Sequence, residues 1–187
     1  MKMKKINYRR LVPLVILVVI FAVILRSSIF ASYVVDGESM QPTLYDGNLL
    51  IVNKVVYNIR DVGRFDVIVF HANEEDDYVK RVIGLPGDEI EYTNDKLYIN
   101  GEYVPEKFLQ VDGYVQASDN HPYTKNFTLT EITGDKVVPE DQLFVMGDNR
   151  GDSYDSRAFG FISMDQLVGK VDIKYWPLSQ TKLSFGK

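Results

Sequence analysis

The chain of 187 residues contains no cysteine and only two histidines. Without cysteine it can form neither disulfides nor thiolate metal sites, and it has no cysteine nucleophile. His71 precedes an acidic loop, and His121 stands beside a proline in a polar stretch. An ordinary loop position explains each histidine better than a catalytic or metal-binding one. Histidine, the usual base for a serine nucleophile, is therefore not evident in this sequence.

Long apolar runs are also scarce, except near the N-terminus. Residues 11–25 are uninterrupted apolar sequence. A helix over residues 11–31 would be about 31 Å long, close to the thickness of the hydrocarbon core of a membrane. Arg26 lies near the outer end of this span, from where its side chain can reach the lipid headgroups. We therefore predict one transmembrane anchor at 11–31, after a cytoplasmic basic tail of residues 1–10.

A cleavable secretory signal is the alternative for the same segment, because it shares the basic start, the apolar stretch and the small residues that follow. Cleavage after Ala31 would leave Ile29 two residues before the cut, and cleavage after Ser32 would leave Phe30 there. Neither position fits the small-x-small pattern of signal cleavage sites. The mismatch favours a retained anchor.

Charge is distributed unevenly along the chain. Residues 1–35 hold six basic residues and no acidic one, although the whole chain has a formal net charge of −5. The positive-inside rule places the N-terminus in the cytoplasm and the body of the protein outside it. The acidic body would repel phosphate, which argues against a nucleic-acid partner.

Helical periodicity is scarce beyond residue 32, where alternation with a period of two prevails. The dipeptide Asn100-Gly101 between two short apolar runs predicts a hairpin with a type I′ turn. The pattern predicts a mainly β fold, with an antiparallel sheet or barrel-like core formed by residues 32–104 and 142–187. The polar residues 105–141 are interpreted as an inserted smaller lobe. The predicted strands cover 47–52, 64–70, 78–85, 89–92, 96–99, 102–104, 143–145 and 170–175, and one short helical turn covers 163–167.

Two side chains follow the anchor with chemistry of interest. Ser39 stands in a segment with glycine and proline, where serine is usually a turn residue. Lys80 lies in a predicted strand, shares its face with Tyr78 and Val82, and has Arg81 on the opposite face. An ordinary lysine is neutral about once in 2,500 molecules at pH 7, and burial on an apolar face would lower its pKa. Alternatively, Lys80 is an edge lysine whose stem covers apolar surface.

A third segment, residues 146–157, follows the predicted strand 143–145 and is dense in acids, hydroxyls and arginines. It fits a solvated loop. It also fits a hydrogen-bonded platform in which carboxylate–arginine pairs hold a turn rigid.

These three segments, behind an N-terminal anchor, resemble the bacterial type I signal peptidases, especially the single-anchor form of Gram-positive bacteria. The resemblance extends from Arg26 to Trp176 and rests on Ser-Met-x-Pro-Thr-Leu at 39–44, Tyr-Val-Lys-Arg-Val-Ile-Gly-Leu-Pro-Gly-Asp at 78–88 and the acid–arginine run at 147–157. It implies a membrane-bound serine endopeptidase that removes signal peptides through an acyl-enzyme, without metal or organic cofactor. The implied partners are secreted preproteins, membrane lipid and the secretion translocon.

The resemblance also implies roles for single residues. Ser39 would be the nucleophile and Lys80 the general base, with the backbone N–H of Ser39 in the oxyanion hole. Some family members supply a second oxyanion donor from a hydroxyl two residues earlier, which Gly37 cannot do. The other implied roles are a hydrogen bond from Ser153 to the lysine amine, ion pairs of Asp148 with Arg81 and of Asp155 with Arg157, and a turn shaped by Met40 and Pro42.

Two other functions compete with this interpretation. A cytosolic Ser/Lys self-cleaving repressor would need a DNA-binding helical domain in place of the anchor, and the sequence contains none. A membrane-tethered β domain that only binds partners would use the three segments as turns and salt bridges. Trp176 is either a core residue or one that touches the outer leaflet of the membrane.

Overall fold

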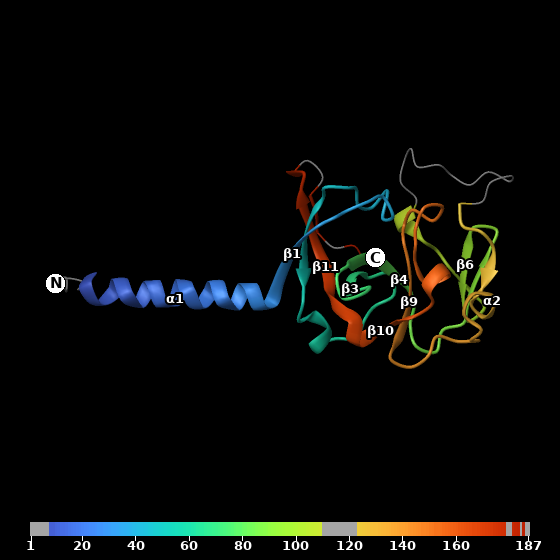
Figure 1. Ribbon diagram of the computed structural model, residues 1–187, viewed down its shortest axis with the longest axis horizontal. Helices are drawn as coiled ribbons and strands as arrows, with labels where there is room; N and C mark the ends of the chain where they lie inside the picture. Colours follow the sequence, from blue (N-terminus) through green and yellow to red (C-terminus); the bar gives the residue numbers. More distant parts are fainter. Residues whose placement is uncertain (1–7, 110–122, 179–180, 184, 186–187) are drawn as a thin grey trace, which may run out of the picture.

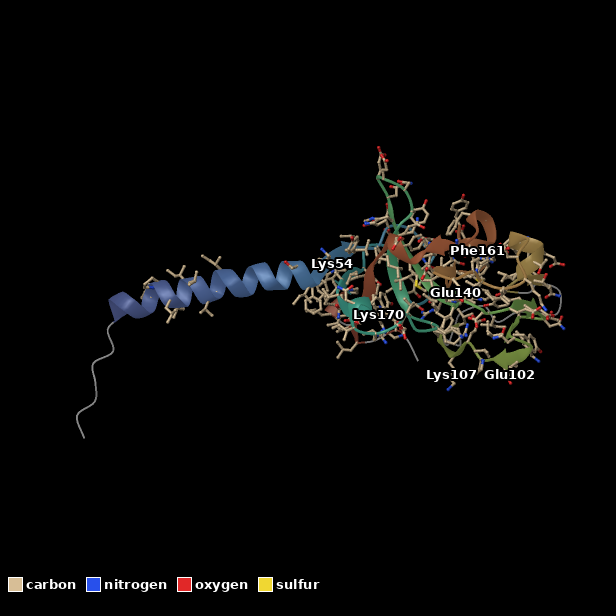
Figure 2. All side chains as sticks on the ribbon, turned by 90° about the horizontal axis from the view of Figure 1, so that it is seen from below. Lys54, Glu102, Lys107, Glu140, Phe161 and Lys170 are labelled. Carbon is tan, nitrogen blue, oxygen red and sulfur yellow. The ribbon has the colours of Figure 1, made fainter. Side chains whose placement is uncertain are left out.

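The computed structural model describes residues 8–109, 123–178, 181–183 and 185, and within the first helix it describes side chains at 12–20 and from residue 28 on. Figure 1 shows this helix standing out from a body built of strands. The helix, α1, covers Tyr8–Ile29. Its side chains at 12–20 are all exposed, and in Figure 2 they project from the helix while those of the body crowd together.

The predicted membrane anchor is tested only in part. Within the described side chains, no helix combines the length and the apolar character that a membrane span requires. The tail 1–10 and part of the segment 11–31 fall outside those side chains, so the anchor stays a prediction. Its outer bound differs from the structure: α1 ends at Ile29, because Phe30 already pairs with Asn53 in an antiparallel ladder.

Most of the described body is one curled antiparallel sheet (Figure 1). Its strands run in the order β1-β2-β11-β3-β4-β9-β10, and β12 pairs with β11. The predicted mainly β, antiparallel fold class is therefore confirmed. The strands are β1 (Phe30–Val34), β2 (Leu49–Asn53), β3 (Val67–His71), β4 (Asp77–Gly84), β9 (Gln142–Met146), β10 (Ile162–Ser163), β11 (Leu167–Trp176) and β12 (Lys182–Leu183).

A second, smaller sheet lies beside β9, with the strand order β7-β6-β5-β8. The predicted hairpin joins two of its strands, and Asn100 and Gly101 have the positive φ angles, 53° and 81°, that a type I′ turn needs. Residues 90–104, assigned to the catalytic core from the sequence, contribute three strands to this sheet. The strands are β5 (Ile90–Thr93), β6 (Lys96–Ile99), β7 (Glu102–Val104) and β8 (Phe127–Thr128).

The predicted inserted lobe, 105–141, contributes β8 and the helix after it, whereas 110–122, with His121, lies outside the described residues. The division of the chain into domains therefore stays a prediction. The short helical turn predicted at 163–167 is present as η3. The short helices are α2 (Leu129–Thr133), α3 (Ser156–Phe159), η1 (Val56–Asn58), η2 (Lys107–Leu109) and η3 (Met164–Gln166).

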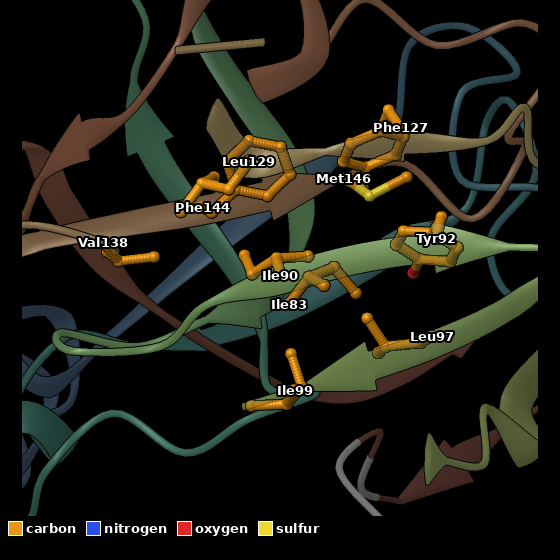
Figure 3. Close-up of a cluster of buried hydrophobic side chains, with 10 residues drawn as sticks. All are labelled: Ile83, Ile90, Tyr92, Leu97, Ile99, Phe127, Leu129, Val138, Phe144 and Met146. Carbon is orange, nitrogen blue, oxygen red and sulfur yellow. The ribbon is translucent and has the colours of Figure 1, made fainter. Parts of the chain in front are cut away.

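The core explains why β3 is a continuous apolar run from Val67 to Phe70. Val67 and Val69 pack into a cluster on one face of the large sheet, and Ile68 and Phe70 pack into another on the opposite face. A strand buried on both faces needs apolar residues at every position. A third cluster joins β4 and β9 to the smaller sheet (Figure 3). It contains Ile83, Ile90, Tyr92, Leu97, Ile99, Phe127, Leu129, Val138, Phe144 and Met146.

Close packing at the end of β4 gives a first testable prediction. A Cβ on Gly84 would collide with Ile90 and come within 2.9 Å of Val138 and 3.0 Å of Phe144. We expect Gly84→Ala to lower the free energy of unfolding by about 1–3 kcal/mol, because the core must shift to admit the methyl group. Urea denaturation measures the change. Gly151→Ala, where a Cβ would meet open space, is the control, and an equal loss in both variants would contradict the packing argument.

Candidate active site

Ser39 lies in a turn between β1 and β2. The turn is closed by backbone hydrogen bonds from Gln41 N–H to Glu38 O, 3.0 Å, and from Leu44 N–H to Met40 O, 2.9 Å. Met40 and Leu44 are both buried in the cluster that also holds Val67 and Val69. These two apolar side chains, four residues apart, fix the turn on the sheet. Pro42 is also buried within it.

Lys80 lies in β4 opposite Ile68 of β3 and is only 5% exposed. Its Nζ lies 2.8 Å from Ser39 Oγ and donates a second hydrogen bond to Val79 O at 3.2 Å. The ring of Tyr78, on the same face of the strand, is 5.3 Å from Nζ. The structure therefore brings together the two residues that the resemblance pairs, although 41 positions separate them in the sequence.

Burial changes the acid–base chemistry of this lysine. It lowers the pKa of Lys80 from 10.5 to about 8, against the opposing charges of Asp155 and Asp148. Each unit of lowering gives about tenfold more neutral amine at a fixed pH below the pKa. When Lys80 is neutral, its lone pair can accept the proton of the Ser39 hydroxyl across the same contact.

The third segment supports the Ser39 turn through hydrogen bonds and close packing. Asn149 donates from its backbone N–H to Ser39 O at 3.0 Å and from Nδ2 to Glu38 O at 3.2 Å. A Cβ on Gly147 would collide with the carbonyl of Ser39 and with the side chain of Ser153, so only glycine permits this close approach. The buried residues of the segment, which include Asp148, Arg150 and Asp155, form a platform, whereas residues 151, 152 and 154 are exposed.

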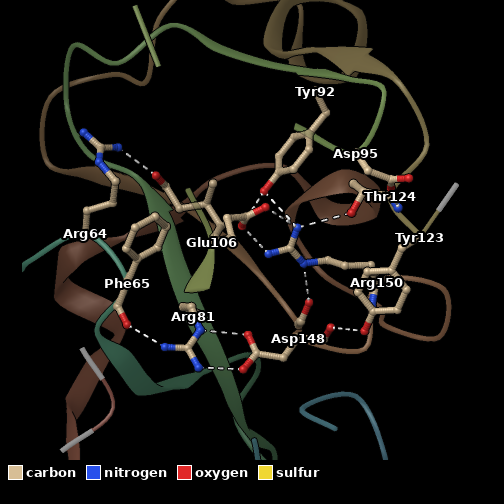
Figure 4. Close-up of polar contacts among 12 residues, drawn as sticks. Arg64, Phe65, Arg81, Tyr92, Asp95, Glu106, Tyr123, Thr124, Asp148 and Arg150 are labelled. Carbon is tan, nitrogen blue, oxygen red and sulfur yellow. Dashed lines mark hydrogen bonds and ion pairs between the residues drawn. The ribbon is translucent and has the colours of Figure 1, made fainter. Parts of the chain in front are cut away.

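Two carboxylate–arginine pairs hold the platform. Asp148 receives two hydrogen bonds from Arg81, at 2.8 and 2.6 Å, with side chains that are 0% and 1% exposed (Figure 4). Asp155 receives two from the guanidinium of Arg157, both 2.8 Å, one from the backbone N–H of Arg157 at 3.2 Å and one from the N–H of Gly147 at 2.9 Å. Burial alone would raise the pKa of Asp155, but Arg157 and the Gly147 N–H hold it below its ordinary value.

Ser153 differs from what the resemblance implies. Its Oγ is buried, and no hydrogen bond joins it to Lys80 in the described part of the chain. In this structure the lysine amine is instead directed at Ser39 Oγ and Val79 O, so the hydrogen bond from Ser153 to the amine stays a prediction.

Ser39 and Lys80 open on a cleft of about 250 Å³ between residues 33–40 and the first half of β4. Across this cleft, Tyr33 donates from its hydroxyl to Asp77 at 2.8 Å. His71 contacts the other oxygen of Asp77 at 2.6 Å and does not line the cleft. Among the residues that the structure describes, no group of three metal-ligating side chains could hold an ion.

Sequence reasoning missed one buried group beside the platform. Arg150 contacts Glu106 and Tyr92, which lie 44 and 58 positions away in the sequence. No motif links these residues. The one available signal was that Arg150 had no carboxylate assigned to it, unlike Arg81 and Arg157.

Comparison with known proteins indicates the family of this chain. A family model described as "Signal peptidase, peptidase S26" matches residues 8–176. The chain is 55% identical over 161 residues to signal peptidase I of Bacillus caldolyticus, covering 86% of this chain and 87% of the relative. It is 44% identical to signal peptidase IB of Staphylococcus aureus, covering 84% and 83%. The crystal structure of a signal peptidase I from Enterococcus faecalis matches with 42% identity and a TM-score of 0.56, over 60% of this chain and 98% of that one.

These similarities place the protein among the peptidases. More narrowly, the chain belongs to the signal peptidase family, peptidase S26.

The buried Arg81–Asp148 pair gives a second prediction. Asp148→Asn would leave Arg81 as a buried cation without its counter-charge, which typically costs about 3–5 kcal/mol. We expect a loss of this size in the free energy of unfolding, measured by urea denaturation at pH 7. Lys136→Gln is the control, because its exposed pair with Glu89 spans 3.8 Å and contributes little. Similar losses in the two variants would show that burial does not govern the Arg81 pair.

Proposed function

We propose that the protein is a membrane-bound serine endopeptidase that removes N-terminal signal peptides from secreted preproteins, with Ser39 as nucleophile and Lys80 as general base. The contact of Lys80 Nζ with Ser39 Oγ, 2.8 Å in a buried setting that lowers the lysine pKa to about 8, carries the proposal. The names of the similar proteins, signal peptidase I and IB, supply the substrate class.

In the proposed reaction, the amine of Lys80 accepts and then donates a proton in each of the two steps, acylation and deacylation. Neutral Lys80 takes the hydroxyl proton of Ser39 as Oγ attacks the scissile carbonyl, and it then gives that proton to the departing amine of the mature protein. The signal peptide stays as an ester on Ser39. A water molecule then attacks this ester while Lys80 takes its proton. Collapse of the second intermediate returns the proton to Ser39 Oγ and releases the signal peptide with a free carboxylate.

The oxyanion of each intermediate needs donors that are not already engaged. In the described residues, the backbone N–H of Ser39 donates to no other backbone group, so it is the donor that we assign. The N–H of Gly37 is engaged by Asp46 Oδ1 at 2.9 Å. Gly37 therefore offers neither a hydroxyl nor a free backbone donor.

The cleft supports an extended substrate with small side chains. Its volume, about 250 Å³, is below the usual range of roughly 300–1,000 Å³ for ligand pockets. Such a space suits a short stretch of extended peptide that lies as an added strand along residues 77–80, the part of β4 that does not pair with β9. Small residues next to the cleaved bond match the small-x-small pattern of signal peptides.

The proposed location is the cell membrane, with residues 11–31 as a single-pass anchor, the N-terminus in the cytoplasm and the catalytic domain outside it. The apolar sequence, the basic tail and the exposed side chains at 12–20 support this location. Trp176 is 52% exposed and is not a core residue, so it is available to the outer leaflet. Membrane lipid and the secretion translocon are the proposed neighbours.

Removal of either reacting group tests the function. We expect Ser39→Ala and Lys80→Ala to reduce cleavage of a purified preprotein in detergent by at least about a thousandfold, because residues that act as a unit fail together. Lys80→Arg should be equally inactive, since guanidinium does not release its proton near neutral pH. Lys136→Gln is the control. Cleavage at the wild-type rate by any of the three variants would refute the assigned pair.

The pKa of Lys80 sets the pH dependence. Only the neutral amine is a base, so kcat/KM should rise about tenfold per unit from pH 6 and level off above about pH 8. Initial rates at low substrate concentration between pH 6 and 10 measure this profile. A flat profile across that range would exclude Lys80 as the titrating base.

A further inference from the structure

The guanidinium of Arg150 is fully buried within the platform that supports Ser39. Its Nε donates to Gly147 O at 3.0 Å, Nη1 donates to the hydroxyl of Tyr92 at 2.8 Å, and Nη2 lies 2.5 Å from Glu106 Oε1 (Figure 4). A buried cation is tolerated only when a counter-charge and hydrogen bonds compensate for the lost water. Glu106 supplies that counter-charge.

Glu106 lies next to the smaller sheet and not in the platform. It follows the last residue of β7, Val104, by two positions, and its side chain is 8% exposed. It also accepts a hydrogen bond from Tyr92 in β5 at 2.8 Å. Burial raises the pKa of Tyr92 well above its ordinary value, so this hydroxyl stays protonated and donates. The smaller sheet therefore presents Arg150 with a fixed anion and a fixed hydroxyl.

A series of short contacts connects Arg150 to Ser39. It fixes the carbonyl of Gly147, and Gly147 packs against the carbonyl of Ser39. Two residues further on, the N–H of Asn149 donates to the same Ser39 carbonyl at 3.0 Å. The carbonyl of Arg150 itself accepts a hydrogen bond from Arg157 at 2.7 Å. The backbone below Ser39 thus has little freedom to shift while Arg150 is held.

We propose that Glu106 is a positioning residue for catalysis, which holds the Ser39 turn in its reactive place through Arg150 and the Gly147–Asn149 backbone. The catalytic part of this inference rests on the proposed function, whereas the positioning part does not. Glu106 does not line the cleft, so it acts through Arg150 and not on the substrate.

Loss of the Glu106 charge would disturb both reacting groups. The other carboxylate that acts on Arg150 is Asp148, which is already paired with Arg81, the neighbour of Lys80. Without Glu106, Arg150 would compete with Arg81 for that carboxylate. A displacement of about 1 Å at reacting atoms can cost about a hundredfold in rate, so even a small shift of the platform should be measurable.

The variants Glu106→Ala, Glu106→Gln and Tyr92→Phe test the inference. Alanine removes the charge and the hydrogen bonds, glutamine removes only the charge, and phenylalanine keeps the buried ring while it removes the hydroxyl between Arg150 and Glu106. Glu89→Gln is the matched control, because it neutralises a glutamate directly before β5 of the same sheet, and the pair of Glu89 with Lys136 is exposed.

Hydrogen exchange, measured by mass spectrometry on the full chain in detergent, reports directly how firmly the platform and the Ser39 turn are held. We expect the amides of peptides that span 147–149 and 39–44 to exchange at least about tenfold faster in Glu106→Ala than in the wild type, with smaller increases in Glu106→Gln and Tyr92→Phe. Glu89→Gln should leave these peptides unchanged. Unchanged protection in the Glu106 variants would overturn the inference whatever their activity.

Steady-state cleavage of a preprotein reads the catalytic consequence. At a temperature where near-ultraviolet circular dichroism shows every variant folded, kcat should fall about 10- to 100-fold in Glu106→Ala, with KM within twofold of the wild type. A loss that affects KM alone, or equal rates for Glu106→Ala and Glu89→Gln, would overturn the inference.

If Glu106→Ala does not fold, Glu106→Gln and Tyr92→Phe decide by the same two measurements. A wild type that cleaves no preprotein would refute the proposed function and leave the exchange measurement to decide the positioning.

Discussion

A lysine amine can act as a base near neutral pH only where the protein withholds the water that would keep it charged. Lys80 meets this condition because it lies in a strand whose face is apolar. The charged groups near it do not reverse the effect of burial. The two carboxylates that would restore its charge, Asp148 and Asp155, are each held by two hydrogen bonds from an arginine. Their paired charges weaken the opposing field, so burial determines the direction of the pKa shift.

The hydroxyl that meets this amine is fixed from two directions. Met40 and Leu44 pack into the core on one face of the large sheet. The Gly147–Asn149 backbone separately contacts the carbonyl of Ser39. The second support depends on Arg150 and therefore on the smaller sheet. In this arrangement the smaller sheet, which contributes no residue to the cleft, still bears on the geometry at Ser39.

The sequence predicted the elements and the reacting pair better than it predicted their surroundings. The apolar run of β3 follows from burial on both faces, and three motifs sufficed to pair Ser39 with Lys80. By contrast, β1 starts inside the predicted anchor, because Phe30 and Ala31 are as apolar as a membrane span and only pairing with β2 makes them a strand. Glu106 carries no local signal, since its partner Arg150 comes close only after two sheets have packed together. The hydrogen bond from Ser153 to Lys80 is absent from the described residues, because similarity indicates which residues lie close together and not the direction of one amine.

The same burial that makes Lys80 reactive weakens the fold over a defined pH range. With a folded pKa of about 8 and an ordinary value of 10.5, the unfolded chain binds more protons than the folded one between these two values. Stability from this group is therefore lowest below about pH 8 and rises as the pH approaches 10.5. At neutral pH the folded protein must hold a buried, mostly charged amine in place. Ile68, Tyr78 and Val82 pack into one apolar cluster at this strand, and the reactive amine exists only in the folded protein, because burial there lowers its pKa.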